Sequence, residues 1–433
     1  MNPAPYPYKV AIIGAGPAGC ALARILLTSS FSDRFSVIIF EGEASPKIRS
    51  QGGTLDLHSE TGLLAIRKAG LYEEFLRLAR FDGEALTICD KQLRRYLSIG
   101  PSAPKIDTDS ARPEIDREQL RHLLLDSLPA DVMRWGWRLR CINVNATSDS
   151  KTLLFENGQT ATGFDLIVGA DGAWSKVRSV LMPHRPFYSG VGGHNMIIPQ
   201  VAARRPAIHR LLRQGSLFAY SDGTVVMGQQ MGDGSVYVSV YSVLAEDWMQ
   251  EASYDVHDGR QVKANYCQKL QEHWHPDLVD LVRAASADPS HITARSIFAM
   301  PIGLRWRHHP QITLMGDAAH LMTPFVGYGA NSALKDAVDL AQVLLDGVAD
   351  GEGVRGMDTR VEHYEQIMVE RTRKAQQLSW DMMRLMLFEA ASPHTTIERY
   401  LIRYFTEGMG TLRAILVGGL VYAYYFVFKA FTI

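Results

Sequence analysis

The sequence predicts an α/β protein in which a discontinuous, Rossmann-like dinucleotide-binding domain carries an inserted antiparallel sheet and is followed by a C-terminal helical region. Three observations support this prediction. A glycine-rich turn at 14–19 follows an apolar strand near the N-terminus. From about 185 to 300 the chain changes to alternating segments separated by turn sequences, which is typical of antiparallel strands. A further apolar strand at 312–315 then leads the chain back into the first domain.

The glycine-rich turn is the most specific of these signals. Gly14 allows a tight turn from strand to helix, Gly16 lets the backbone approach a pyrophosphate, and Gly19 lets the helix pack closely on its strand. The helix that follows would present free N–H groups and its positive end to the phosphates. The alternative is an ordinary glycine-rich turn of an α/β protein, but the strand–turn–helix context favours a nucleotide site.

The next strand narrows the choice of nucleotide. It covers 36–40 and ends at Glu41, 22 residues after Gly19. A carboxylate at this position accepts hydrogen bonds from a ribose 2′-OH and repels a 2′-phosphate. The first dinucleotide is therefore FAD or NAD rather than NADP.

The later elements are predicted from periodicity and turn signals. In the first domain we expect a helix over 59–80, a hairpin over 81–100, a helix capped by Asp116, strands near 134–145 and 151–156, and a strand at 164–170. In the inserted sheet we expect strands at 216–220, 224–229, 235–241 and 297–300, with a helix near 259–285.

These elements group into domains of ordinary size. A chain of 433 residues is long enough for two or more domains and a large core. The predicted parts are a dinucleotide-binding domain at 1–184 and 301–357, a sheet domain at 185–300, a helical region at 358–408 and a hydrophobic tail at 409–433.

Composition excludes several function classes. With 45 basic and 46 acidic side chains and no basic block, the chain has no electrostatic footprint for nucleic acid. Its four cysteines are scattered without metal spacing, which favours a reducing compartment and no metal site. No nucleophile–base pair is recognisable, so no side chain is assigned as catalytic.

The hydrophobic tail differs from the rest of the chain. Between Arg413 and Lys429 lie 15 uncharged, mostly apolar residues. This is shorter than a full span, but flanking basic side chains extend it. We expect attachment to a cytoplasm-facing membrane, with a cytoplasmic protein whose tail packs on its own surface or in a dimer interface as the alternative.

Three motifs together resemble those of the group A FAD-dependent monooxygenases, the para-hydroxybenzoate hydroxylase class. They are the glycine-rich turn with Glu41, DLIVGADGAWSKVR at 165–178 and GDAAHLMTPFVGYGAN at 316–331. The tetracycline-inactivating flavin monooxygenases are closest in motifs, through GGTLDLH at 52–58 and EIDREQLR at 114–121.

The resemblance implies FAD as the resident cofactor and NADPH as a transient reductant. Asp317 would hold a ribose or ribityl hydroxyl at a strand end, Arg49 would contact NADPH, and Asn331 would cap a helix. Arg178 belongs to the motif of Asp171, with a surface ion pair as its alternative role. The cofactor-binding residues implied are Gly14, Gly16, Gly19, Glu41, Arg49, Asp56, Arg117, Asp171, Asp317, Pro324, Gly327, Tyr328, Gly329, Ala330 and Asn331.

The resemblance also implies a reaction. NADPH reduces the flavin, O2 converts it to a C4a-hydroperoxide, and one oxygen atom passes to the substrate. The protein places the ring, orients the substrate and excludes water.

By position against the tetracycline enzymes, Asn195, Ser216, Tyr237 and Phe325 would line the substrate pocket. Those enzymes carry Gln, Arg and His at the first three of these positions, and Gln is usual at the place of Tyr328. Loss of the Arg removes charge-assisted recognition, although Arg213 lies three residues away.

A less polar pocket favours hydroxylation or epoxidation of a lipophilic aromatic, indolic, polyketide or terpenoid metabolite. The alternatives are an enzyme that inactivates tetracycline-type antibiotics, a flavoprotein reductase or halogenase, and a non-enzymatic flavin-binding protein.

Overall fold

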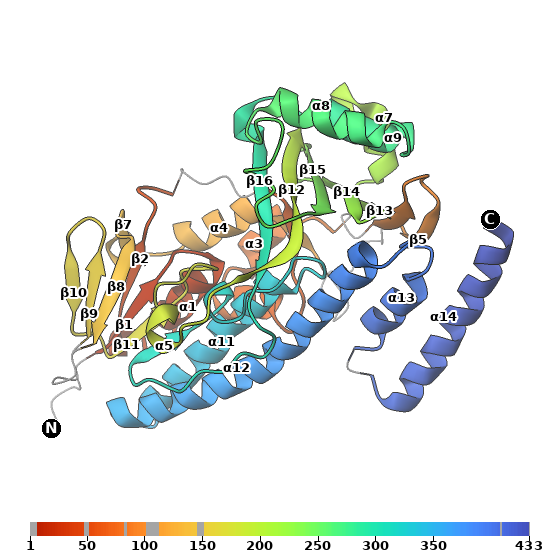
Figure 1. The fold of residues 1–433 in the computed structure, drawn as a ribbon. Coiled ribbons are helices and arrows are strands. Elements are labelled where there is room, and N and C mark those ends of the chain that lie inside the picture. The colour runs from red at the N-terminus through yellow and green to blue at the C-terminus, as the bar shows by residue number, and fades with distance from the viewer. Residues whose placement is uncertain are drawn as a thin grey trace, which may run out of the picture. The chain divides into compact units, whose positions relative to one another are not determined.

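The computed structural model describes residues 7–46, 52–81, 85–100, 112–144, 151–407 and 409–432 (Figure 1). Arg49 lies outside these residues. The chain forms two compact units, which are described separately. Unit 1 comprises Met1–Arg80, Lys105–Phe187 and Phe298–Gln377, and unit 2 comprises Phe81–Pro104, Tyr188–Ile297 and Leu378–Ile433.

A parallel sheet of five strands forms the centre of unit 1. Its order is β17 (Ile312–Leu314), β11 (Leu166–Gly169), β1 (Tyr8–Ile13), β2 (Phe35–Glu41) and β7 (Met133–Trp135). These strands read as apolar runs because parallel strands are covered on both faces. The strand at 312–314 pairs with the strand at 166–169, so the predicted return of the chain to this domain is confirmed.

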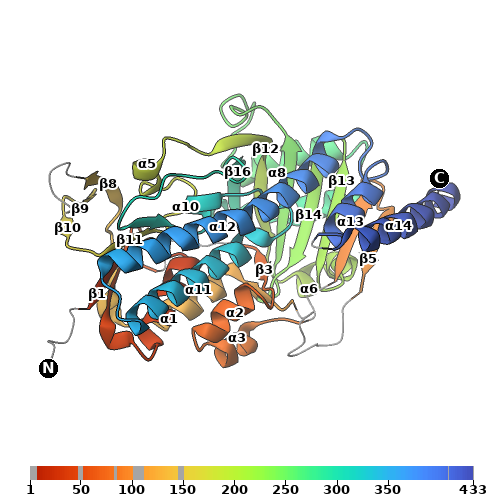
Figure 2. The same cartoon turned by 90° about the horizontal axis from the view of Figure 1, so that it is seen from below.

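Helices cover this sheet, and α11 and α12 run side by side (Figure 2). The expected helix at 59–80 is two helices, because the chain turns at Gly70 with a φ of +70°. The helices of unit 1 are α1 (Pro17–Thr28), α2 (Gly62–Lys68), α3 (Tyr72–Leu78), α4 (Arg117–Asp126), α5 (Arg178–Leu181), α10 (Asp317–His320), α11 (Tyr328–Ala349) and most of α12 (Val354–Met383).

Two small antiparallel sheets complete unit 1. One pairs β3 (Thr54–Asp56) with β6 (Glu114–Asp116), and the other contains β8 (Leu139–Val144), β9 (Lys151–Phe155) and β10 (Thr160–Thr162). Asp116 occupies the predicted N-cap position of α4, but its side chain makes no capping hydrogen bond.

Unit 2 is built on a seven-stranded sheet. Its order is β16 (Ile292–Ala299), β12 (Phe187–Ile198), β15 (Val236–Val243), β14 (Thr224–Gln230), β13 (Ser216–Ser221), β4 (Leu86–Asp90) and β5 (Arg95–Ile99). The predicted strands at 216–241 are confirmed. The predicted hairpin at 81–100 also forms, but it extends this sheet because β4 pairs in parallel with β13.

The two faces of this sheet differ in composition. One face is covered by α7 (Pro206–Leu212), α8 (Gly259–Leu270) and α9 (Pro276–Ala284), with Val236, Val238 and Val240 fully buried beneath them. The helix expected at 259–285 is interrupted before Pro276, which begins α9. α6 (Val201–Arg204) precedes α7. The alternate residues of β15, at 237, 239 and 241, belong to the opposite face.

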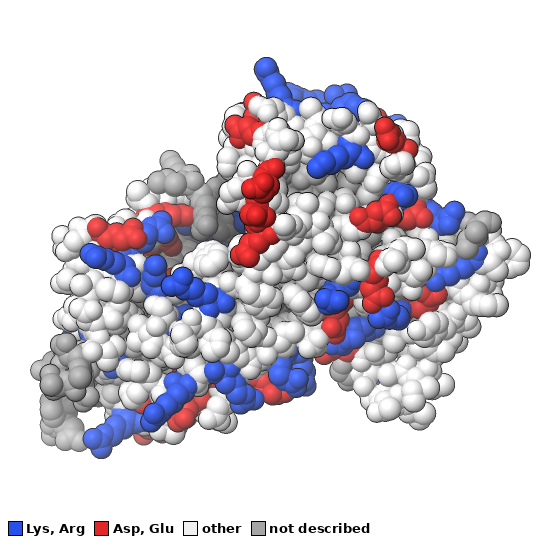
Figure 3. Space-filling model, in the orientation of Figure 1, with Lys and Arg blue, Asp and Glu red and all other residues white. Residues whose placement is uncertain are grey.

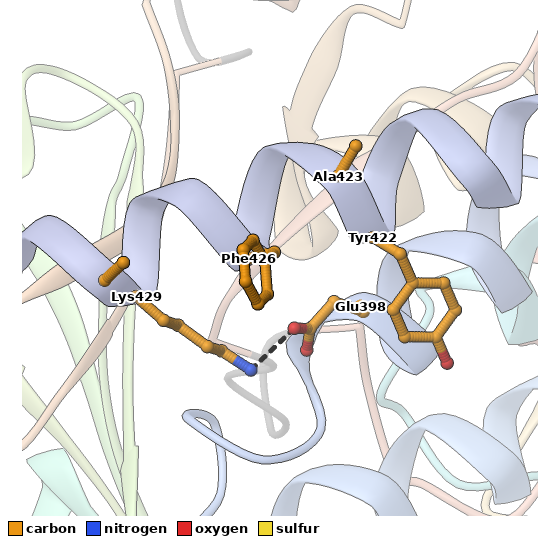
Figure 4. A pocket seen from close by; sticks show the side chains of 6 residues that line it. Glu398, Tyr422, Ala423, Phe426 and Lys429 are labelled. Carbon is orange, nitrogen blue, oxygen red and sulfur yellow. Dashed lines mark hydrogen bonds and ion pairs between the residues drawn. The ribbon is translucent and has the colours of Figure 1, made fainter.

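The C-terminal region follows α12 with a π-helical turn at Arg384–Phe388, α13 (Ile397–Phe405) and α14 (Thr411–Thr432). α14 is tied to unit 2 by Tyr425, whose hydroxyl donates to the Tyr96 carbonyl at 2.5 Å, and by the ion pair of Lys429 with Glu398 at 2.6 Å. A hollow of ≈ 630 Å³ lies beside that ion pair, between Tyr422 and Lys429 (Figure 4).

Most of α14 faces solvent. Among the described residues it is one helix that is long and apolar enough to cross a membrane, with Thr411–Phe431 at a mean hydropathy of 1.7. Its exposed large apolar residues are Leu412, Ile415, Leu416, Leu420, Tyr422, Tyr424, Phe426, Val427 and Phe431.

Candidate functional site

The three glycines of the turn in unit 1 have different surroundings. Gly14 has a φ of +111°, and a Cβ on it would lie 2.4 Å from the Ala170 carbonyl oxygen. A Cβ on Gly19 would lie 2.3 Å from the Gly14 carbonyl oxygen, whereas one on Gly16 would meet no protein atom within 4 Å. Because a side chain at either position would clash with the backbone, only glycine fits at Gly14 and Gly19. Gly16, the N-cap of α1, is left open to the approach of a ligand such as a pyrophosphate.

Glu41 shapes this turn from the end of β2. Its Oε2 accepts the Ala15 N–H at 2.7 Å and its Oε1 accepts the Glu43 N–H at 2.9 Å. A carboxylate oxygen can accept more than one hydrogen bond, so Glu41 keeps acceptor capacity for a ribose hydroxyl.

The second motif is tied together by Asp171 and Arg178. Asp171 accepts the Ser175 hydroxyl at 2.5 Å and the Lys176 N–H at 2.7 Å, so its carboxylate holds its own turn. Burial raises the pKa of Asp171, and these hydrogen bonds oppose the rise. Arg178 is 2 % exposed and donates to the carbonyls of Ala173 at 2.6 Å and Ala318 at 2.9 Å. The alternative of a surface ion pair is wrong, because Arg178 is buried and joins the second motif to the third.

Asp317 is the first residue of α10, three residues after β17 ends, rather than the end of the strand itself. Its side chain is exposed to solvent on one side. The surrounding protein nevertheless desolvates the carboxylate, and this desolvation raises the pKa of Asp317. The charges of His320 and Arg117 oppose this rise. The structure thus brings two predicted cofactor residues, Asp317 and Arg117, within electrostatic reach of each other.

A buried carboxylate that the sequence did not single out supports Asp317. Asp336 on α11 is fully buried and accepts the Gly316 N–H at 2.7 Å, His320 Nε2 at 2.6 Å and Arg371 at 2.6 Å. Burial alone would raise the Asp336 pKa, but the charges and hydrogen bonds of these partners hold it below its ordinary value. The available signal was an acidic residue on the apolar side of a predicted helix.

Asn331 does not cap α11, because the N-cap is Gly327, with a φ of +70°, and Asn331 is the fourth helical residue. Asn331 is 2 % exposed, and its Oδ1 accepts the His58 N–H at 2.9 Å and the Gly62 N–H at 3.2 Å. Its Nδ2 donates to the Asp56 carbonyl at 2.8 Å. Asn331 is therefore a tie between the first turn of α11 and the segment that follows β3.

The remaining predicted residues of the third motif gather at the same helix start. Tyr328, Gly329 and Ala330 are the first three residues of α11, and the Gly327 N–H donates to the Pro324 carbonyl at 3.2 Å. A Cβ on Gly327 would lie 3.1 Å from Asp56 Oδ1. The positive end of a 22-residue helix thus lies beside Asp56. The free N–H groups of the helix suit a ligand edge that carries partial negative charge, whereas the Asp56 carboxylate suits a hydrogen-bond donor.

The structure brings three of the four predicted substrate residues to one face in unit 2. Ser216 lies opposite Gln229, which lies opposite Tyr237, and Asn195 lies opposite Ser239 on the same strand as Tyr237. Directly opposed residues share a face, so Asn195, Ser216 and Tyr237 all belong to the face away from α7, α8 and α9. Phe325 belongs to unit 1.

Sequence reasoning missed two partners of Asn195. Its Oδ1 accepts the Ser239 hydroxyl at 2.7 Å and the Tyr241 hydroxyl at 3.0 Å. Only strand register reveals these contacts. Among the described residues no group of three or more His, Cys, Asp or Glu side chains is arranged to hold a metal ion.

Comparison with known proteins identifies relatives over most of the chain. The family described as FAD binding domain matches residues 7–379. Monooxygenase asqM of Emericella nidulans is 30% identical over 437 residues, covering 89% of this chain and 97% of that protein. Monooxygenase penA of Penicillium thymicola is 29% identical over 419 residues, covering 87% of this chain and 95% of that protein.

Solved structures share the fold. HpxO of Klebsiella pneumoniae, complexed with FAD and uric acid, has a TM-score of 0.72 at 20% identity and covers 96% of both chains. Tetracycline destructase Tet(55) has a TM-score of 0.67 at 19% identity, covering 92% of this chain and 96% of that one.

Proposed function

Because this chain belongs to the FAD binding domain family of flavin monooxygenases, we propose that it uses NADPH and O2 to oxygenate a lipophilic secondary metabolite. The predicted fold class, the resemblance to group A flavin monooxygenases and the assignment as an FAD-dependent monooxygenase are confirmed. The observation that carries the proposal is the gathering of three separated motifs in one unit, where Gly14 packs against the Ala170 carbonyl and Arg178 donates to the Ala318 carbonyl.

The residues present fit FAD. Gly16 and the start of α1 would bind the pyrophosphate, Glu41 a ribose hydroxyl, and Asp317 with Arg117 the chain between ring and phosphates. The start of α11 with Asp56 would hold the pyrimidine side of the ring. Bound FAD supplies the redox chemistry of O2 activation, while this chain's residues bind, orient and exclude water. The loops that carry these FAD-binding residues would be held in place by Asp171, Pro324, Tyr328 and Asn331. Arg49 would contact NADPH.

We assign substrate binding to Asn195, Ser216, Tyr237 and Phe325. Neighbouring residues on the sheet face are mostly apolar or aromatic, including Met227 and Phe218, which supports a lipophilic aromatic, indolic, polyketide or terpenoid substrate. Arg213 donates to Ser98 Oγ at 3.0 Å, so it is already engaged and does not simply replace the missing arginine of the tetracycline enzymes.

The experiment is NADPH oxidation and O2 uptake by the purified holoprotein against a panel of lipophilic aromatics, indoles and tetracyclines, with mass detection. A compound that accelerates NADPH oxidation and gains one oxygen atom supports the proposal. Turnover confined to tetracyclines would favour antibiotic inactivation. A flavin that NADPH does not reduce with any candidate present would favour a flavin-binding protein, and reduction without oxygenated product would favour a reductase.

We further propose that the protein faces the cytoplasm and attaches to a membrane surface through α14. Its inner face is held by Tyr425 and Lys429, whereas its outer face is apolar, with Leu412, Leu416 and Leu420 at least 62% exposed. The surface over α14 shows few charges (Figure 3). A helix tied along one side suits an interfacial position rather than a crossing. The four cysteines are free, in keeping with a reducing compartment.

Flotation with phosphatidylcholine vesicles tests this attachment. The double variant Leu412→Glu with Leu416→Glu should lose flotation, whereas Ile302→Glu, an exposed apolar position of unit 1, should retain it. A dimer by light scattering that the double variant dissolves, without flotation of the native protein, would assign the face to a second copy instead.

A further inference from the structure

The buried amide of Asn195 is held by two hydroxyls on the neighbouring strand. Asn195 on β12 lies directly opposite Ser239 on β15, and Tyr241 follows two residues later on the same face. Ser239 Oγ donates to Asn195 Oδ1 at 2.7 Å and Tyr241 OH donates to the same oxygen at 3.0 Å. The three residues are only 5%, 5% and 6% exposed.

These two bonds orient the amide. A carbonyl oxygen has two lone pairs, and Ser239 and Tyr241 occupy both. Oδ1 is therefore directed at the hydroxyls, and Nδ2 with its two N–H donors points away from them. Within the described part of the chain, Nδ2 donates no hydrogen bond to protein. Nδ2 is not one of the fully buried polar atoms without a partner in the described part of the chain, so it is open to solvent, and a ligand acceptor can replace water there.

We propose that Ser239 and Tyr241 fix the Asn195 amide so that its Nδ2 donates to a carbonyl oxygen of the substrate. This inference rests on the proposed function and narrows the substrate to a neutral, carbonyl-bearing aromatic compound. A neutral amide donor suits a ketone, lactam or ester carbonyl, whereas a carboxylate would call for Arg or Lys. The apolar neighbours on the face, such as Met227 opposite Ser239, suit the hydrocarbon frame around that carbonyl.

Asn195→Asp tests the direction of this hydrogen bond. The carboxylate still accepts from Ser239 and Tyr241, so the local packing is kept, while the outward group changes from a donor to an acceptor. The probes are 1-tetralone and tetralin, which share a bicyclic frame and differ by the carbonyl oxygen. Isothermal titration calorimetry on the native holoprotein should show about tenfold tighter binding of the ketone, as expected for one satisfied hydrogen bond. In Asn195→Asp this preference should vanish or reverse, with tetralin affinity unchanged.

The two orienting hydroxyls are tested separately. Ser239→Ala with Tyr241→Phe frees the amide to rotate, so the ketone preference should fall severalfold while flavin content stays the same. Ser242→Ala is the matched control. Ser242 lies on β15 like Ser239 and Tyr241, but on the opposite face of the sheet, where its hydroxyl lies 2.9 Å from that of Thr224 on β14. This variant should leave the preference unchanged.

Three results would overturn the inference. They are equal affinity for the two probes in the native protein, no binding of either probe, and a ketone preference that survives Asn195→Asp. NADPH oxidation and O2 uptake are measured on the same preparations. If these persist with an oxygenated product while the preference is absent, the proposed function stands and only the donor role of Asn195 fails.

Discussion

At the scale of single residues, Asp317 and Asp336 show how two nearby carboxylates take different roles. Asp336 is fully buried, and a backbone N–H, a histidine and an arginine satisfy it. Asp317 is exposed and lies within electrostatic reach of Arg117 and Arg178. The first carboxylate therefore shapes the loop, and the second remains available to a ligand.

Asp317→Ala should lower FAD affinity about tenfold or more, because a charged hydrogen-bond acceptor toward a ligand hydroxyl is removed. The measurement is flavin content per protein by absorbance after gel filtration. Asp339→Ala, which removes an acidic residue on α11 that pairs with Lys335, is the control and should keep its flavin. Full flavin content in Asp317→Ala would contradict the assigned role.

Asp336→Asn should destabilise unit 1 by about 3 kcal/mol or more, because it removes the buried carboxylate that His320 Nε2 and the Arg371 guanidinium both contact. Thermal unfolding followed by circular dichroism measures the effect. Asp339→Asn removes the other acidic partner of Arg371, at 3.3 Å and partly exposed, and should cost about 1 kcal/mol or less. Equal losses for the two variants would refute the special role of Asp336.

At the scale of elements, the sequence predicts those helices, strands and turns whose signals lie within a few neighbouring residues. The turn at Gly14 to Gly19 is predicted by its glycines, and the strands at 216–241 are predicted by the alternation of their side chains. The hairpin at 86–99 was predicted as a hairpin, but its pairing with β13 joins residues far apart in the sequence. The same holds for Asp336, whose partners are brought to it by packing of α10 and α12.

His308 makes the packing of α12 in unit 1 depend on pH. Its Nδ1 lies 2.9 Å from Glu365 and its Nε2 lies 3.3 Å from Asp358. The hydrogen bond to Glu365, followed by the charges of both acids, outweighs burial and raises the pKa of His308 to about 9. Because this pKa exceeds the unfolded value, the stabilisation is complete below about pH 6.5 and is lost as the pH rises through 9.

His308→Gln should therefore lower the free energy of unfolding by about 1–2 kcal/mol at pH 6, and by progressively less toward pH 9.5. Urea unfolding across this pH range measures the difference. His363→Gln, an exposed histidine on α12, should show no such trend. A deficit for His308→Gln that is constant with pH would show that shape rather than charge is lost.

At the scale of the whole molecule, the residues proposed for cofactor binding and those proposed for substrate and membrane contact belong mostly to separate units. The glycine-rich turn, Asp317 and the start of α11 all belong to unit 1, whereas Asn195, Ser216, Tyr237 and α14 belong to unit 2. The sequence could reveal the first set because nucleotide motifs have fixed spacing. It could not identify Ser239 and Tyr241, because register alone brings them to Asn195. It also left open whether the tail packs on the protein, which depends on the contacts of Tyr425 and Lys429.

Removal of residues 410–433 should separate attachment from catalysis. No predicted FAD-binding residue lies in this segment, so flavin content and NADPH oxidation should stay within about twofold of the native protein, a change of less than 0.5 kcal/mol. Flotation with phosphatidylcholine vesicles should disappear together with the apolar outer face. Thermal stability of unit 2 should fall, because Tyr96 and Leu401 lose the cover of α14. Loss of flavin on truncation would show that the helix supports the fold around FAD, whereas a truncated protein that still floats would assign membrane contact to another surface.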